Sequence, residues 1–252
     1  ATGDEAHLTR GRANTLRLAL SGQLGNAGLA SDEVHEALDL CVSCKGCKRE
    51  CPTGVDMARM KIEVMHQVRQ KQGLGLRDRL VAYLPDYARH AARWSGLLNA
   101  RNKTGWMARL MEQVAGISSR RSLPTWESRH FFNRGTMGVS AAQALASDRA
   151  VVLFVDTFNG HFESETALDA FKVLSAAGYD VHVAAKTDLG HGANQGHLCC
   201  GRTYLSTGLV DQARAKAQEM LAALKPFAEK GISIVGLEPS CLLTLRDEYS
   251  AL

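Results

Sequence analysis

Four cysteines are crowded into one short segment of the chain. Cys41, Cys44, Cys47 and Cys51 follow one another at intervals of three, three and four residues, and Pro52 comes directly after the last. Four thiolates at this spacing, with a proline after the fourth, are the ligand pattern of iron–sulfur clusters, notably of the four-iron, four-sulfur (4Fe-4S) type. The segment therefore predicts a one-electron carrier.

We expect a tight turn at Gly46 to bring three of these thiolates together. Zinc is the main alternative metal, although structural zinc sites usually take their cysteines as separated pairs. Core cysteines without a ligand would follow a helical or strand stripe, which this spacing does not. Lys45, Lys48 and Arg49 lie among the cysteines, where they would raise the potential of a cluster, dock an acidic partner, or simply be exposed.

A second group of cysteines lies in the C-terminal half. Cys199 and Cys200 are adjacent and precede Gly201, and Cys241 follows further along. A glycine at this position would let a ligand approach the backbone closely. The three thiols either form a second cysteine site or fill the core. His191 and His197 are close in sequence, but a lone histidine is more often structural than catalytic.

Composition limits the function classes. Of 252 residues, 45% are hydrophobic and 22% charged, which is typical of a folded globular protein. The net charge of +4 comes from scattered side chains, so we expect no nucleic-acid partner. Without an apolar run of bilayer length or a signal peptide, the sequence predicts a soluble, cytoplasmic protein. It begins at an alanine, so we expect a fragment of a longer protein.

Hydrophobic periodicity predicts an α + α/β protein. We expect a helical domain over residues 1–120, a connector over 121–148 and an α/β domain over 149–252. In the helical part, Ser31 is a candidate N-cap, and a helix beginning at Thr53 or Asp56 should end at Gly73.

The C-terminal half alternates between strand and helix patterns. Strands are expected at 150–155, 180–185 and 232–237, and a helix over 209–230 that is broken or kinked at Pro226. Such alternation predicts a mostly parallel sheet. Ligands of these sheets bind at the carboxyl ends of the strands, here at residues 156–161 and 238–241.

Longer motifs make a family recognisable. The segments HLCCGRTYLSTGLV and GLEPSCLLTLRDEY resemble the cysteine-rich CCG domain of heterodisulfide reductase, of glycolate oxidase iron–sulfur subunits and of the anaerobic glycerol-3-phosphate dehydrogenase small subunit. Together with LTRGRANTLRLALSG and CKGCKRECPTGVDMARMK, they are most similar to the C-terminal region of large FAD-linked D-2-hydroxyacid dehydrogenases, such as bacterial D-2-hydroxyglutarate dehydrogenase.

This resemblance implies the iron–sulfur portion of a flavoprotein, with a helical ferredoxin-like domain followed by the CCG domain. Substrate, D-2-hydroxyglutarate or D-lactate, would be oxidised on FAD in an upstream flavin-oxidase module of the same polypeptide. Electrons would pass to a quinone, a cytochrome or a carrier protein. The location would be cytoplasmic or peripheral to the inner membrane, with no membrane-spanning segment.

The resemblance also divides the ligands. Cys41, Cys44 and Cys47 would hold one cluster, and Cys51 would serve a second cluster whose other ligands lie outside this sequence. The CCG half departs from its pattern, because it has Asp156-Thr157-Phe158 in place of an early cysteine and ends in Cys241-Leu242-Leu243-Thr244 in place of CxxC. Two other hypotheses stay open, a stand-alone reductase subunit of the heterodisulfide reductase or glycolate oxidase type and a zinc-bound interaction module.

Overall fold

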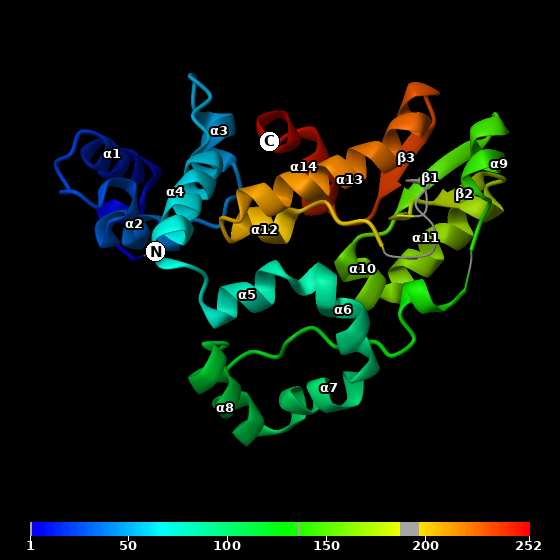
Figure 1. Cartoon of the computed structure of the whole chain (residues 1–252), viewed down its shortest axis with the longest axis horizontal. Helices are drawn as coiled ribbons and strands as arrows, with labels where there is room; N and C mark the ends of the chain where they lie inside the picture. Colours follow the sequence, from blue (N-terminus) through cyan, green and yellow to red (C-terminus); the bar gives the residue numbers. More distant parts are fainter. Residues whose placement is uncertain (1, 136, 187–196) are drawn as a thin grey trace. The chain divides into compact units, whose positions relative to one another are not determined.

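The computed structural model describes residues 2–135, 137–186 and 197–252 (Figure 1). They form two compact units, the first comprising Ala1–Arg79 with Tyr204–Val210 and the second Leu80–Thr203 with Asp211–Leu252. The helices of residues 80–115 thus group with the sheet, whereas the division expected from sequence placed them with the cysteine segment.

The first unit is helical. Its helices are α1 (Thr9–Leu20), α2 (Asp32–Asp39), α3 (Gly46–Glu50), α4 (Met57–Gln72) and the start of α5 (Leu76–Ala82). The expected boundaries are confirmed at three points, since Ser31 caps α2, Asp56 caps α4 and Gly73 ends α4. Apolar side chains of α1, α2, α4 and the short 3-10 turn before α2 form one core: Leu16, Ala19, Ala30, Val34, Leu38, Met57, Val64 and Val68.

A segment from late in the sequence completes this unit. In Tyr204–Val210, Gly208 has a φ of 83°. A Cβ atom there would lie 2.6 Å from the Met65 carbonyl oxygen, so only glycine lets the segment approach α4 this closely. His66 Nδ1 donates to the Gly208 carbonyl at 3.0 Å, and Arg69 Nε donates to that of Thr207 at 3.1 Å.

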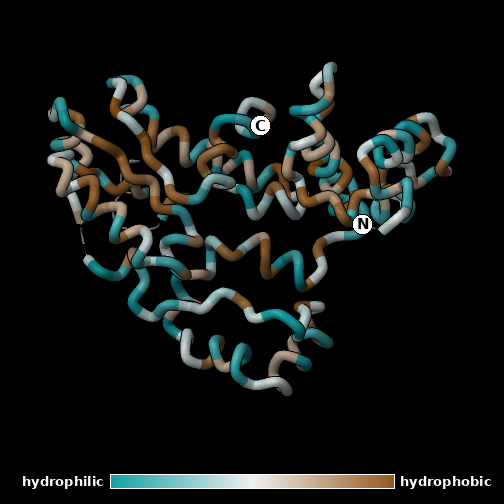
Figure 2. Tube along the Cα trace, turned by 180° about the vertical axis from the view of Figure 1, so that it is seen from behind, coloured by the Kyte–Doolittle hydropathy of each residue, from teal (hydrophilic) through white to brown (hydrophobic). Residues whose placement is uncertain are grey.

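The second unit contains a parallel sheet, as the sequence predicts. Among the described residues, β1 (Ala150–Phe154) lies between β2 (Asp180–Val183) and β3 (Ser233–Gly236). The central strand alternates between two cores, with Val152 and Phe154 in one and Val151 and Leu153 in the other. It is therefore buried on both faces, and the hydropathy colouring runs brown through it (Figure 2).

Helices supply both cores. The helices that lie wholly or mostly in this unit are α6 (Leu84–Arg93), α7 (Ser95–Lys103), α8 (Gly105–Ala115), α9 (Ala141–Ala146), α10 (Thr157–His161), α11 (Ser164–Ala176), α13 (Val210–Glu229) and α14 (Pro239–Arg246), whereas α12 (Arg202–Ser206) belongs mostly to the first unit. One core takes side chains from α9, α13 and α14, and the other from α11.

Two local expectations fail. Helix α13 continues through Pro226 to Glu229 without a break, because the flanking Leu224 and Phe227 are buried in the core and hold the backbone in place. Hydrophobic periodicity also predicts a single helix over residues 86–99, but the chain forms two helices there, α6 and α7, with Trp94 between them. No helix in the described residues is long and apolar enough to cross a bilayer.

Candidate functional site

The cysteine segment of the first unit is held against that unit's core. Cys41 and Cys47 pack on the cluster of apolar side chains from α1, α2 and α4. Lys61 of α4 donates from Nζ to the carbonyl oxygens of Leu38 at 2.9 Å and Cys41 at 2.7 Å. Burial lowers the pKa of Lys61. One ammonium group therefore fixes the backbone where α2 ends and the cysteine loop begins.

The turn of the loop does not depend on Gly46, contrary to expectation. Ser43 and Lys45 have positive φ angles of 55° and 61°, whereas Gly46 begins the short helix α3. A Cβ atom on Gly46 would meet Cys44 Sγ only at an ordinary contact distance of 3.7 Å. Left-handed backbone at two residues other than glycine is costly and is found mainly at functional sites.

Three of the four cysteines line one small cavity. A space of about 110 Å³ is lined by Cys41, Cys44 and Cys47, together with Arg12 and Met57. Cys51 is not among its lining residues. The Cys51 thiol instead shares a hydrogen bond of 3.1 Å with the Thr53 hydroxyl, and this bond lowers the Cys51 pKa, with smaller contributions from nearby backbone amides.

Basic side chains surround the loop. Arg12 lines the cavity and donates from Nε to the Ala37 carbonyl at 3.0 Å. Lys48 and Arg59 lie 3.4 Å and 3.7 Å from the Asp56 carboxylate. Asp56 also accepts from the backbone amides of Ala58 and Arg59, so that it caps α4. Positive charge beside the loop would stabilise an anionic group held there.

The residue types of the loop fit a thiolate-bound metal group, but the side chains are not yet arranged to hold one. Among the described residues, no three histidine, cysteine or acidic side chains are already arranged to hold a metal ion. Cys44 is exposed and Cys41 and Cys47 are half-buried, which leaves their side chains room to change rotamer. Bringing three sulfurs together would require these side chains to rotate inward.

The second cysteine group is brought together in the other unit. Cys199, Cys200 and Cys241 are 8%, 2% and 3% exposed. The hydrogen bond with Cys200 and burial raise the pKa of Cys199. For Cys200, the bond from Cys199 lowers the thiol pKa, but the bond to Cys241 and burial outweigh it and leave the pKa raised. At neutral pH, Cys199 and Cys200 are therefore neutral thiols.

Neighbouring residues of this group have structural roles. Gly201 has a φ of 80°, and a Cβ atom there would lie 3.1 Å from the Ala213 carbonyl oxygen on α13. The glycine thus allows backbone to approach a helix. Asp156, in the place of the missing early cysteine, caps α10 by accepting from the amides of Phe158 and Asn159. Tyr249 donates from its hydroxyl to the Cys200 carbonyl at 3.0 Å.

A histidine cluster beside these thiols is not evident from the sequence. The His161 ring is 4.5 Å from that of His130 and 5.1 Å from that of His197, measured between centroids. His161 is fully buried, and neither ring nitrogen has a hydrogen-bond partner. Burial, with His197 and His130 adding to it, lowers the pKa of His161 to about 3. His191 lies outside the described residues.

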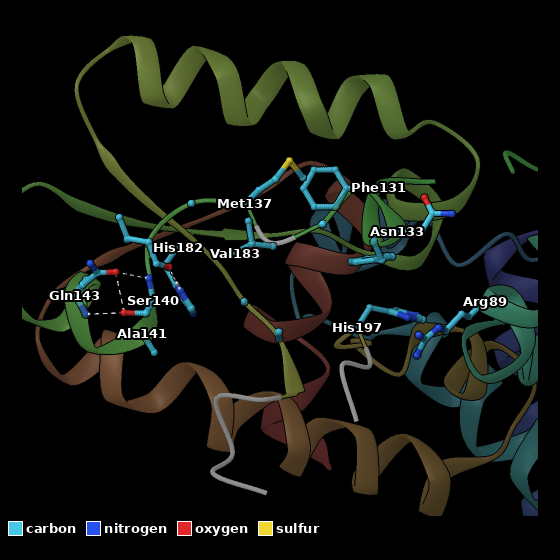
Figure 3. Close-up of a pocket in the computed structure, with 16 residues that line it drawn as sticks. Arg89, Phe131, Asn133, Met137, Ser140, Ala141, Gln143, His182, Val183 and His197 are labelled. Atoms are coloured by element: carbon cyan, nitrogen blue, oxygen red, sulfur yellow. Dashed lines mark hydrogen bonds between the residues drawn. The ribbon is translucent and has the colours of Figure 1, made fainter. Parts of the chain in front are cut away.

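The second unit also contains a large cavity of about 750 Å³. In Figure 3, Arg89 and His197 lie toward one end of the cavity and Ser140 and Gln143 toward the other. The Phe132 ring stacks on that of His197 at 4.9 Å. Ser140 and Gln143 form the capping box of α9, so their polar groups are already used. Arg89 is the main cation at the cavity.

Comparisons with known proteins agree with the family resemblance. The chain is 24% identical over 225 residues to a protein named D-2-hydroxyglutarate dehydrogenase from Pseudomonas putida and, over 225 residues, 24% identical to one of that name from Escherichia coli. A third, from Haemophilus influenzae, is 21% identical over 226 residues.

Each match covers 87% of this chain but only 21% of the relative, so the chain spans about a fifth of the length of these proteins. No family model matches the chain, and no solved structure matches it. The chain is therefore similar, over most of its length, to one segment of proteins named as D-2-hydroxyglutarate dehydrogenases.

Proposed function

We propose that the chain is the iron–sulfur electron-transfer portion of a flavin-dependent D-2-hydroxyacid dehydrogenase. The observation that carries the proposal is the cavity of the cysteine loop, which Cys41, Cys44 and Cys47 line together with the basic residues Arg12 and Lys45. When bound there, a 4Fe-4S cluster supplies reversible one-electron transfer. The relatives' names support the substrate class, and their greater length supports a separate flavin module.

The residues of the loop would have distinct tasks. Cys41, Cys44 and Cys47 would hold one cluster, and Lys61 would keep the first of these ligands in place through the Cys41 carbonyl. Cys51, which lies apart from the cavity, would serve a second cluster completed by ligands from outside this chain, as in two-cluster ferredoxin motifs. Arg12 and Lys48 would offset negative charge on the thiolates and so raise the reduction potential.

Substrate chemistry would take place elsewhere. We assign no residue of this chain to FAD or to the hydroxyacid, and the flavin-oxidase module would lie in the part of the relatives that the match does not cover. On its own the chain should not oxidise substrate. Its contribution to the enzyme would be to accept electrons from the flavin and pass them to a quinone, a cytochrome or a carrier protein.

Anaerobic reconstitution with iron and sulfide tests the cluster. We expect broad visible absorption and, after reduction, an EPR signal that Cys44→Ser abolishes. Cys241→Ser is the matched control, because it removes a thiol of the other unit and should leave the signal intact. The proposal fails if the protein stays iron-free with four alkylatable thiols in this loop, including in a version extended upstream. Stoichiometric zinc in the isolated protein would support the zinc-bound module instead.

A reductase role for the second cysteine group has less support, and the EPR experiment can distinguish it from the role of the cysteine loop. A stand-alone reductase would need Cys199, Cys200 and Cys241 to bind a cluster or attack a disulfide, and burial with neutral thiols opposes both. Cys199 alone lines an opening, a cavity of about 300 Å³ with Lys186 and Lys216. If this site acts, Cys199→Ser should abolish reductase chemistry while leaving the loop's EPR signal unchanged.

A further inference from the structure

The hairpin formed by α7 and α8 exposes large apolar side chains that the proposed function does not use. On α8, Trp106, Leu110 and Val114 are 67%, 52% and 64% exposed. They are spaced four residues apart and so form one stripe along the helix. Trp94 and Leu97, at the start of α7, are 67% and 62% exposed. We call these five side chains the tryptophan surface.

Other side chains of both helices are already in use. On α8, Ala108 and Ala115 are buried. On α7, Asn99 exchanges two hydrogen bonds of 2.9 Å with the backbone of Trp126. Arg101 donates to the Ser118 and Arg121 carbonyls, both at 2.6 Å. The hairpin is thus fixed in the second unit, and the tryptophan surface is what it presents to the surroundings.

The charge around this surface is strongly one-sided. Between Trp94 and Arg121 the sequence has five basic residues and one acidic residue. That surplus of four equals the net charge of the whole chain. Among the basic side chains, Lys103, Arg109, Arg120 and Arg121 are exposed. Like charge opposes pairing of two copies through this surface and favours an anionic partner.

We propose that the tryptophan surface binds the interface of an anionic lipid bilayer. Tryptophan is enriched at the membrane–water boundary because its ring is apolar and its indole N–H stays wet. Apolar side chains beside lysine and arginine are the pattern of helices that lie in this interface. Such binding needs no spanning helix, in agreement with the absence of one in the described residues. It would place an electron carrier at the membrane, independently of whether a cluster is bound.

Flotation of the full chain with vesicles tests this proposal. We expect binding to vesicles of equal parts phosphatidylglycerol and phosphatidylcholine and little binding to phosphatidylcholine alone. The double variant Trp106→Ser, Leu110→Gln should lose binding about tenfold or more. Its matched control is Val173→Ser, Leu221→Gln, which removes two side chains of 67% and 53% exposure elsewhere in the same unit and should bind like the unsubstituted chain.

Charge and depth are measured separately. Arg109→Gln should weaken binding to the anionic vesicles about fivefold, whereas Lys225→Gln, an exposed charge on α13, should have no effect. In a Trp126→Phe background, emission from the other two tryptophans should shift to the blue and be quenched by brominated lipid. Three results would overturn the proposal: no vesicle binding, equal binding to neutral vesicles, or self-association that the Trp106→Ser, Leu110→Gln variant abolishes.

Discussion

The buried histidine cluster makes the second unit sensitive to mild acid. His161 is fully buried without a partner for either ring nitrogen, and burial, followed by repulsion from His197 and His130, lowers its pKa to about 3. In the unfolded chain the same ring titrates near its ordinary value of 6.5. Between these two values the unfolded state binds a proton that the folded state does not, so stability is lost as the pH falls.

The size of the effect follows from the two pKa values. One pKa unit corresponds to about 1.36 kcal/mol, so lowering the pH from about 7 to about 5 should cost the folded state about 2 kcal/mol through His161. His161→Phe keeps an aromatic ring and removes both unpaired nitrogens. We expect this variant to be at least as stable as the unsubstituted chain at neutral pH and to lose about 2 kcal/mol less on acidification.

Tryptophan fluorescence during urea denaturation isolates this unit, because Trp94, Trp106 and Trp126 all belong to it. Comparing each variant with the unsubstituted chain cancels the acid response of the carboxylates. His90→Gln, at an exposed histidine of α6, is the control and should keep the full response. The reasoning is refuted if His161→Phe loses as much stability between the two pH values as the unsubstituted chain does.

Three further predictions concern the first unit. Gly208→Ala should destabilise the packing of Tyr204–Val210 on α4 by about 1–3 kcal/mol more than the control Gly25→Ala does. Both glycines have positive φ, but of these two only Gly208 would place a Cβ atom against backbone. Hydrogen exchange of α4 amides measures the difference, and equal protection in the two variants would contradict the prediction. Asp56→Ala should lower the free energy of unfolding by about 1 kcal/mol, because it removes the N-cap of α4. The amides of Ala58 and Arg59 should then exchange hydrogen faster, and unchanged exchange would argue against the cap. Lys61→Met should speed alkylation of Cys41 but not of Cys51, because Lys61 holds the carbonyl of Cys41 and makes no such bond to Cys51. Parallel increases at both thiols would argue for general loosening instead.

Local signals in the sequence were sufficient for much of the fold. Ser31, Asp56 and Gly73 bound their helices because caps depend on side chains only a few residues away. The apolar run at β1 predicted a strand buried on both faces, since its neighbours in a parallel sheet are covered by helices. The spacing of the cysteine loop also predicts a ligand pattern, and that assignment stays a prediction.

The features that the sequence did not reveal depend on contacts between distant segments. His130, His161 and His197 share no periodicity and meet only because the connector, α10 and the chain after β2 converge beside the sheet. Gly46 was expected to make the turn, but the strain lies at Ser43 and Lys45, which have no compositional signal for positive φ. Likewise, Pro226 stays within α13 because core packing outweighs its local preference.

The return of Tyr204–Val210 to the first unit affects how this protein is made on the ribosome. Domains usually fold in order of synthesis as the chain emerges, at about 5–20 residues per second. Here the helices up to Arg79 emerge first, but the segment that packs on α4 is some 130 residues later, a delay of roughly 7–26 s. During that interval His66 and Arg69 have no carbonyl acceptors from Thr207 and Gly208. The cysteine loop is therefore translated well before the segment that completes the unit holding it.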